Sequence, residues 1–345
     1  MDYRIIEGDC IEGMRRLEGQ SVNCVVTSPP YFGLRDYGHD GQIGLEASPD
    51  AFVAKLVDVF REVRRVLRDD GTVWLNLGDS YAGAGPSGAS YESETTKRRA
   101  EMKTDGSFRI SKTLASRGLT YADKKPIPPP GLKKKDLIGI PWRVAFALQA
   151  DGWYLRQDII WHKPNPMPES VRDRCTKAHE YIFLLSKSER YFYDNEAVKE
   201  PLAEASIGRA GRKQRLMDRT GAGTLGKQIV DGVDATHAYA GLALGRNGKT
   251  GYDLDSGLRN RRSVWTVATK PYKGAHFATF PPDLIRPCIL AGCPKDGIVL
   301  DPFGGSGTTA LVALEEGRKA VLCELNSDYI ALAHKRLEGL QLRIA

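Results

Sequence analysis

The sequence contains no uninterrupted apolar run that approaches the roughly 20 residues needed by a membrane-spanning helix. Cysteine is scarce, with six in 345 residues and no Cys-x-x-Cys pair, which disfavours a disulfide framework and a zinc ribbon. The histidines do not form the His-Glu-x-x-His pattern of zinc hydrolases, and no signal-peptide pattern is present. We therefore expect a cytoplasmic protein with reduced thiols, no membrane contact and no bound metal.

Basic residues outnumber acidic ones, 50 to 43, which gives a formal net charge of +7 and a pI near 9.0. This balance favours a polyanionic partner. The basic residues are concentrated in residues 97–135 and 209–262, and both stretches interrupt segments with a regular apolar pattern. Because charge runs are also common in solvated surface loops, composition agrees with nucleic-acid binding without requiring it.

A glycine-rich turn lies near the C-terminal end. An apolar run at residues 298–300 is followed by Asp301, by three glycines within four residues, and by a helical pattern at residues 308–314. A strand, turn and helix in this order let a ligand approach the backbone, and the free N–H groups favour polar or anionic ligand groups. Dinucleotide and triphosphate loops have a different spacing, and no lysine follows Gly307.

The next apolar segment, residues 319–323, ends at Glu324, about 20 residues after the glycines, where such folds bind a ribose hydroxyl. The turn and the acid together suit adenosine. The turn alone is equally common as a purely structural connection between a strand and a helix.

A second motif, Ser-Pro-Pro-Tyr, follows the apolar strand pattern of residues 21–27. Two prolines end the strand abruptly, because proline fixes φ and donates no backbone hydrogen bond. A proline-rich loop after an edge strand would have the same composition. An aromatic ring beside unpaired carbonyl groups also suits a planar base that carries an amino group.

These two motifs resemble those of the DNA amino-methyltransferases, which modify the exocyclic amine of cytosine or adenine. The catalytic motif precedes the cofactor motif here, the permuted order of the beta class. The resemblance implies catalytic roles for Ser28, Pro29, Pro30 and Tyr31. It implies S-adenosyl-L-methionine as the cofactor, bound by Asp9, Cys10, His276, Phe277, Ala278, Phe280, Pro281, Asp301, Pro302, Phe303, Gly304, Gly305, Ser306, Gly307, Thr308, Thr309, Glu324 and Leu325.

The chemistry of the acceptor suggests a mechanism. An exocyclic amine is a poor nucleophile because its lone pair is delocalised into the ring. We hypothesise that the Ser28 hydroxyl and the Pro29 carbonyl accept the two amine hydrogens while Tyr31 stacks on a base extruded from the duplex. Methylation of cytosine carbon 5 would instead need a thiolate. The Pro-Cys pair at 287–288 lies in a helical apolar pattern, so we interpret Cys288 as a core residue.

The remaining segments predict an α/β fold. Helical patterns at 51–67 and 139–151 alternate with strand patterns at 72–77, 153–161 and 181–185, and residues 69–71 are expected to form a turn. Alternation of this kind indicates a mostly parallel sheet covered by helices on both faces. The resemblance implies a Rossmann-like methyltransferase fold whose sheet ends in a reversed hairpin, for which residues 179–194 are the candidates.

The expected divisions are a catalytic-motif half (1–80), a basic insertion that clamps DNA or contacts a partner (81–135), a continuation of the catalytic domain (136–195), a target-recognition region (196–262) and a cofactor-binding half (263–345). Double-stranded DNA is the expected partner, with Arg35, Lys163, Arg212, Lys213, Arg215, Arg261 and Arg262 as contacts. For Arg35 an ion pair with Asp36 is an equal alternative, and for the long charge runs so is a solvated surface. A homodimer and a cognate restriction endonuclease are further candidate partners.

The base is left open between cytosine N4, which we favour, and adenine N6. In the resembled family, serine before Pro-Pro-Tyr is commoner among enzymes of the first kind, but permuted members blur the rule. Two alternatives keep the fold and change the function: a DNA-binding regulator without catalysis, and a methyltransferase acting on RNA or on protein amides.

Overall fold

The computed structural model describes residues 2–33, 41–82, 128–129, 131–202, 252–253, 257–269 and 280–344. The chain divides into two compact units, which are considered separately. The first unit comprises Met1–Tyr193 and Ser263–Ala345, and the second comprises Asp194–Arg262. None of the helices in the described ranges combines the length and apolarity of a membrane span.

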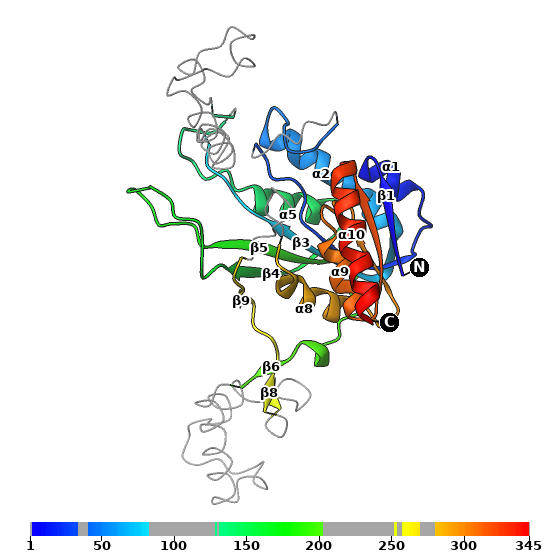
Figure 1. The fold of residues 1–345 in the computed structure, drawn as a ribbon. Coiled ribbons are helices and arrows are strands. Elements are labelled where there is room, and N and C mark those ends of the chain that lie inside the picture. The colour runs from blue at the N-terminus through cyan, green and yellow to red at the C-terminus, as the bar shows by residue number, and fades with distance from the viewer. Residues whose placement is uncertain are drawn as a thin grey trace, which may run out of the picture. The chain divides into compact units, whose positions relative to one another are not determined.

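The first unit is built on an eight-stranded sheet with the order β1-β11-β10-β2-β3-β5-β4-β9 (Figure 1). Its strands are β1 (Tyr3–Glu7), β2 (Val22–Thr27), β3 (Leu67–Leu77), β4 (Tyr154–His162), β5 (His179–Ser186), β9 (Val264–Thr266), β10 (Ile298–Asp301) and β11 (Lys319–Glu324). Strand β5 is antiparallel to both of its neighbours, and all the other pairings are parallel. The carboxyl ends of the parallel strands and the amino end of β5 therefore lie along one edge, which we call the carboxyl edge.

Helices cover both faces of this sheet (Figure 1). Helices α1 (Cys10–Arg15), α2 (Pro49–Val66) and α5 (Ile140–Ala150) pack on one face, and α8 (Pro282–Gly292), α9 (Thr308–Glu315) and α10 (Ser327–Ile344) pack on the other. This arrangement confirms the predicted α/β fold with a mostly parallel sheet. Cys288, interpreted as a core residue, is buried in α8.

Helix α2 shows how the sequence specifies these elements. The Ser48 side chain accepts a hydrogen bond from the backbone N–H of Ala51 at 3.1 Å, and proline occupies the first helical position. The helix is amphipathic, and its buried face is formed by Phe52, Leu56, Val59, Phe60, Val63 and Val66. Burying each large apolar side chain contributes about 1.5–3 kcal/mol, so packing against the sheet is the main support of this helix.

Two predictions about the sheet are wrong. Residues 69–71 do not form a turn, because they lie inside β3, where the pairing of β2 with β3 shifts register between Val22 and Cys24. The Asp-Asp-Gly sequence thus produces an irregularity within an extended strand. The reversed hairpin is present and is formed by β4 and β5. Its placement at residues 179–194 is wrong, because β5 begins at His179 but its partner β4 precedes it in the chain. No strand occupies residues 187–194.

The ends of the basic insertion lie side by side. Tyr81 forms an isolated antiparallel bridge with Leu137. The Ala82 N–H donates to the Asp136 carbonyl and the Lys135 N–H donates to the Ala82 carbonyl, both at 2.8 Å. The two segments that flank residues 83–127 are therefore hydrogen-bonded to each other.

The second unit contains a short helical turn, η1 (Glu196–Val198), and a three-stranded sheet of β6 (Glu200–Pro201), β8 (Leu258–Arg259) and β7 (Tyr252–Asp253). The Glu200 carboxylate pairs with Arg259 at 3.0 Å and with Arg262 at 2.7 Å. One acidic side chain thus holds two of the basic residues of this unit.

Candidate active site

The two motifs predicted to act together follow neighbouring strands. Strands β10 and β2 are parallel and adjacent, with Val299 opposite Cys24 and Leu300 opposite Val25. The glycine loop (residues 301–307) begins where β10 ends, and the Ser-Pro-Pro-Tyr motif (residues 28–31) follows β2. Their meeting point lies where the strand order reverses, which is the usual ligand site of open α/β sheets.

Asp301 joins the two strand ends. Its carboxylate accepts hydrogen bonds from the Thr27 hydroxyl at 2.6 Å, the Thr309 hydroxyl at 2.6 Å and the Phe303 N–H at 3.0 Å. The residue is 1% exposed, and its burial raises the pKa of the carboxyl to about 6 despite these three donors. A single buried side chain therefore links β2, β10 and α9.

The glycine loop is pressed against its neighbours. The Gly304 N–H donates to the Cys323 carbonyl at 2.8 Å, and a Cβ atom at this position would lie 2.8 Å from Cβ of Leu322. Gly307 has a φ of +78°, and a Cβ there would lie 2.9 Å from Cβ of Ala333 in α10. The close packing explains why two of the three glycines cannot carry a side chain without displacement of the backbone.

Glu324 fixes the conformation of the loop from the end of β11. One carboxylate oxygen accepts from the Gly305 N–H at 2.7 Å and the other accepts from the Asn326 N–H at 2.9 Å. The backbone carbonyl of Glu324 accepts from the Gly8 N–H at 2.9 Å, which brings the acidic turn beside the loop. Asp9 in that turn caps α1 by accepting from Ile11 and Glu12.

The structure gives several residues expected at the cofactor a role inside the protein. The polar side-chain atoms of Asp301 and Thr309 are bonded to each other, and the Thr308 hydroxyl accepts from Arg336 at 2.8 Å. These side chains therefore support a ligand indirectly, by holding the conformation of the glycine loop. Ser306 is buried under Arg336, and Leu325 is half-buried after β11. His276, Phe277 and Ala278 lie outside the described residues, whereas Phe280 and Pro281 directly precede α8.

In the Ser-Pro-Pro-Tyr motif, Ser28 is half-buried and Pro29 is buried. The Tyr31 ring lies against the backbone of Gly78, at the end of β3, where a Cβ atom would be 2.5 Å from Cε2 of the ring. The Tyr31 hydroxyl donates to the Glu180 carboxylate at 2.7 Å. Both the ring and the hydroxyl of Tyr31 are thus held by residues at the carboxyl edge.

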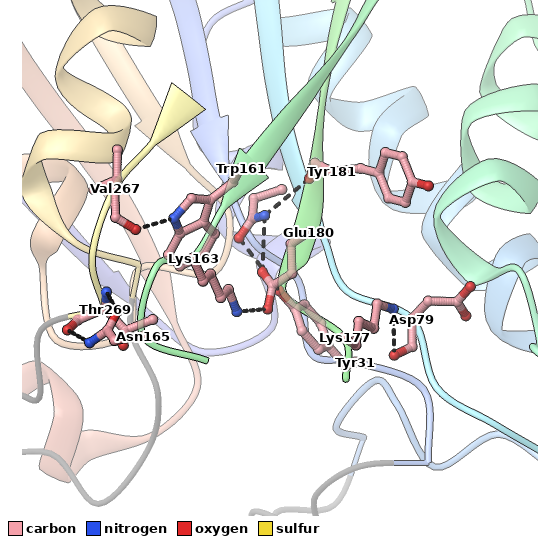
Figure 2. A network of polar contacts seen from close by, with 11 residues as sticks. Tyr31, Asp79, Trp161, Lys163, Asn165, Lys177, Glu180, Tyr181, Val267 and Thr269 are labelled. Atoms are coloured by element: carbon pink, nitrogen blue, oxygen red, sulfur yellow. Dashed lines mark hydrogen bonds and ion pairs between the residues drawn. The ribbon is translucent and has the colours of Figure 1, made fainter. Parts of the chain in front are cut away.

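Glu180 is the centre of a polar network (Figure 2). Its carboxylate also accepts from the Asn76 amide at 3.2 Å and forms an ion pair with Lys163. The Lys163 ammonium lies 4.3 Å from the centre of the Trp161 ring, and the indole N–H of Trp161 donates to the Val267 carbonyl at 2.8 Å. The network therefore extends from the end of β2 across β3, β5 and β4 to the segment after β9.

A second contact closes the same edge. The Lys177 ammonium donates to the Asp79 carbonyl at 3.0 Å, and burial lowers the pKa of this amine. The Asp79 carboxylate accepts from the N–H groups of Gly139 and Ile140, and so caps the start of α5. The loop after β3 is thereby held between a helix and the β4–β5 connection.

The predicted DNA contacts have different fates. Arg35, Arg212, Lys213 and Arg215 lie outside the described residues. The Lys163 side chain is only 18% exposed and its ammonium is paired with Glu180, and its contact with DNA stays a prediction. In the second unit, the Arg262 side chain is 69% exposed and Arg261 is half-buried. The described ranges contain no cluster of side chains suited to a metal ion.

The network around Glu180 was not found by sequence analysis. Asn76 lies in a predicted strand, and Gly78 and Glu180 lie directly beside predicted strands, whose patterns indicate only burial. Glu180 meets Tyr31 because β5 is reversed. The available signal was a polar residue next to an apolar strand pattern, but its neighbours depend on the strand order.

Comparison with known proteins agrees with this geometry. The DNA methylase family matches residues 22–335 of the chain. The chain is 46% identical to the Type II methyltransferase M.XycI of Xanthomonas campestris pv. cyanopsidis, over 97% of this chain and 87% of that protein. It is 46% identical to M.Cfr9I of Citrobacter freundii with the same coverage, and 45% identical to M.SmaI of Serratia marcescens, over 97% of this chain and 90% of that protein.

Two solved structures share the fold. The cytosine-N4-specific PvuII DNA methyltransferase superposes with a TM-score of 0.57 at 17% identity, over 97% of this chain and 86% of that chain. A proposed DNA modification methylase from Thermus thermophilus, complexed with S-adenosyl-L-methionine, gives a TM-score of 0.51 at 20% identity, over 97% and 94%. At these identities the likeness concerns the fold.

Proposed function

The chain belongs to the DNA methylase family of N6 and N4 amino-methyltransferases, and from that premise we propose that it methylates the N4 amine of a cytosine extruded from duplex DNA. Its relatives are Type II DNA methyltransferases, and the cofactor of the family is S-adenosyl-L-methionine. The observation that supports the proposal best is the hydrogen bond between Thr27 and Asp301, because it holds the catalytic motif beside the glycine loop.

The residues of the glycine loop fit this cofactor. The loop backbone packs closely at Gly304 and Gly307, where side chains are excluded. The Glu324 carboxylate is bonded to the loop, and the turn that carries Asp9 is bonded to the Glu324 carbonyl. Carboxylates of this kind suit the ribose hydroxyls and the adenine amine of a nucleoside. When bound, S-adenosyl-L-methionine supplies an electrophilic methyl group on a sulfonium.

The protein's contribution to transfer is to orient the amine. Within the described part of the chain, no hydrogen-bond partner is assigned to the Ser28 hydroxyl or to the Pro29 carbonyl. Both oxygens are therefore available to accept hydrogen bonds from the two amine hydrogens. These hydrogen bonds favour the pyramidal form of the amine, whose lone pair is free to attack. The Tyr31 ring provides a stacking surface that offsets part of the cost of extruding the base, a few kcal/mol.

Cytosine N4 is preferred to adenine N6 for two reasons. Serine precedes Pro-Pro-Tyr in this chain, and the PvuII enzyme with the same fold is cytosine-N4-specific. Expression of the protein in a methylation-free bacterial host, followed by mass spectrometry of the nucleosides, tests the choice. We expect N4-methylcytosine to accumulate. N6-methyladenine in its place would reverse the choice of base but leave the reaction class intact.

Substitution of Ser28 with alanine tests the assigned mechanism. Loss of one hydrogen-bonding group at a reacting centre typically lowers kcat about 10²-fold to 10³-fold, so we expect a loss of that size. Calorimetry should give the wild-type affinity for S-adenosyl-L-methionine, because Ser28 is not part of the glycine loop. Undiminished transfer by the variant would exclude the proposed role of Ser28.

The alternatives give different results in the same assays. A DNA-binding regulator would bind DNA in the presence of the cofactor and yield no methylated nucleoside. A methyltransferase for RNA or protein amides would bind the cofactor, and RNA would compete with duplex DNA for the protein. Two features favour DNA as the substrate: the basic composition of the chain and its similarity to Type II DNA methyltransferases.

Target reading is proposed for the second unit, where the family places its recognition region. The exposed Arg262 and the neighbouring Arg261 and Arg259 supply basic groups there, and arginine is the side chain best suited to phosphates and guanine edges. The basic insertion is proposed to clamp the DNA backbone. Dimerisation and a cognate restriction endonuclease are proposed from the family and from the Type II relatives.

A further inference from the structure

We propose that Glu180 is a positioning residue, which sets the orientation of Tyr31 for the extruded base and is itself oriented by Lys163. The inference rests on the proposed function, since it concerns how the base is received. It assigns roles to two side chains that the catalytic motif does not include.

The hydrogen bond from Tyr31 defines the first step. An ionised carboxylate only accepts hydrogen bonds, so the Tyr31 hydroxyl is the donor in its 2.7 Å hydrogen bond with Glu180. Hydrogen bonds to an ionised acceptor are about twice as strong as neutral ones. The far end of the ring is therefore held by a strong directional contact.

The second constraint acts on the ring itself. A Cβ atom at position 78 would lie 2.5 Å from Cε2 and 3.1 Å from both Cδ2 and Cζ of Tyr31. The ring thus rests directly on the backbone at Gly78, which limits its rotation. With the hydroxyl held by Glu180 and one side of the ring held by Gly78, the ring is fixed before a base arrives, so binding need not order it.

Lys163 determines where the carboxylate points. The Glu180 side chain is 15% exposed, and a carboxylate at this depth needs a compensating charge. Lys163 supplies it on one oxygen, while Tyr31 and Asn76 donate to the other oxygen. Both oxygens are thus engaged, and the carboxylate has little freedom to turn.

The position of Lys163 is itself constrained. Its ammonium lies over the Trp161 ring, which is anchored through its indole N–H to the Val267 carbonyl (Figure 2). A half-buried ion pair contributes little to stability compared with apolar side chains of similar volume. Because this pair lies at the carboxyl edge and Glu180 is bonded to Tyr31, orientation of Tyr31 explains the presence of the pair better than stability does.

A double-mutant cycle on the full-length protein tests the proposal. The variants are Glu180→Gln, Tyr31→Phe and the combination, each measured by single-turnover methyl transfer to a duplex oligonucleotide and by calorimetry with S-adenosyl-L-methionine. We expect each single variant to lose about 10-fold to 100-fold in the transfer rate, as misplacement of a reacting group does. Cofactor affinity should be unchanged. The double variant should be no slower than the slower single variant, because both changes break the same hydrogen bond.

Glu316→Gln is the matched control, since Glu316 is a half-buried carboxylate paired with arginine, Arg286, at the far end of α9. It should transfer methyl groups at the wild-type rate. A target base replaced by 2-aminopurine adds a readout of orientation, because Tyr31 should quench its fluorescence in the wild type and less so in Glu180→Gln.

The outcomes separate the two hypotheses. If the wild type methylates DNA and Glu180→Gln does so at the same rate, the positioning role is overturned and the proposed function stands. Losses that multiply in the double variant would also overturn it, because they would show that the two residues act independently. A wild-type protein that binds the cofactor but methylates no DNA would overturn the proposed function, and the positioning role with it.

Discussion

Gly78 shows how a single residue without a side chain shapes the candidate site. Because the Tyr31 ring occupies the space that a Cβ would need, the identity of residue 78 determines how close the aromatic ring lies to the sheet. The residue is buried at the end of β3 and its neighbour Asp79 caps α5, so the backbone there has little room to move.

We predict that Gly78→Ala lowers the rate of methyl transfer about 10²-fold, the effect of a displacement near 1 Å at a reacting centre. A Cβ placed 2.5 Å from Cε2 must push the Tyr31 ring away. Cofactor binding should be unchanged, because the glycine loop is separate. The comparison is steady-state kinetics with calorimetry on both proteins.

Gly339→Ala provides the control for that substitution. Gly339 is exposed in α10, and a Cβ there meets nothing within 4 Å. Alanine should preserve activity and stabilise the helix by about 1 kcal/mol. If Gly78→Ala were as active as Gly339→Ala, the position of Tyr31 would not limit transfer.

At the scale of elements, the Asp301 carboxylate connects β2, β10 and α9, and this connection depends on pH. Burial raises the pKa of the folded carboxyl to about 6, above its ordinary value of 3.8. The folded protein therefore binds this proton more tightly than the unfolded chain does. The contribution of this group to stability is fully present below pH 3.8 and is lost as the pH rises to about 6.

We predict that replacing Asp301 with asparagine removes this dependence. The unfolding free energy of the wild type should fall relative to that of Asp301→Asn as the pH rises from about 4 to about 6. Above that range the difference between the two proteins should stay constant. Denaturant titrations across this range measure it. If the wild type instead became more stable relative to Asp301→Asn over this interval, the raised pKa would be contradicted. Because Asp301→Asn weakens the connection between β2, β10 and α9, methyl transfer by this variant should also be slower at every pH.

The sequence predicted elements better than it predicted their pairing. Residues 298–300 and 319–323 were expected as strands and belong to β10 and β11, because apolar runs bounded by glycine and acidic residues are unambiguous there. The turn expected at residues 69–71 and the placement of the reversed hairpin at residues 179–194 were wrong, since local composition does not specify strand partners.

The same limit applies to the site. The two motifs carry their own chemical signature, whereas the contact between Tyr31 and Glu180 depends on which strand is reversed. Lys163 was expected to contact DNA. Its pairing with Glu180 becomes visible only when β4 and β5 are placed side by side.

At the scale of the whole molecule, the two ends of the basic insertion are paired with each other. We infer that the rest of the first unit folds without residues 83–127. We predict that replacing residues 83–127 with a short Gly/Ser linker leaves the thermal midpoint and the affinity for S-adenosyl-L-methionine unchanged, because the contacts of Tyr81 and Ala82 with residues 135–137 are retained.

DNA binding should weaken and become less sensitive to salt, since the removed residues carry many of the basic groups. Fluorescence anisotropy with duplex DNA over a range of salt concentrations measures both effects. An unfolded deletion variant would contradict the independence of the unit. Unchanged DNA affinity and salt dependence would contradict the clamp.

The pairing of β1 with β11 joins opposite ends of the chain, with Tyr3 opposite Ala320 and Glu7 opposite Glu324. During synthesis at about 5–20 residues per second, β1 must wait on the order of tens of seconds for the strand that completes its side of the sheet. The hydrogen bond from the Gly8 N–H to the Glu324 carbonyl can form only after that. A nascent chain therefore cannot complete the proposed cofactor site until β11 has been translated, and a chain terminated before β11 cannot acquire it.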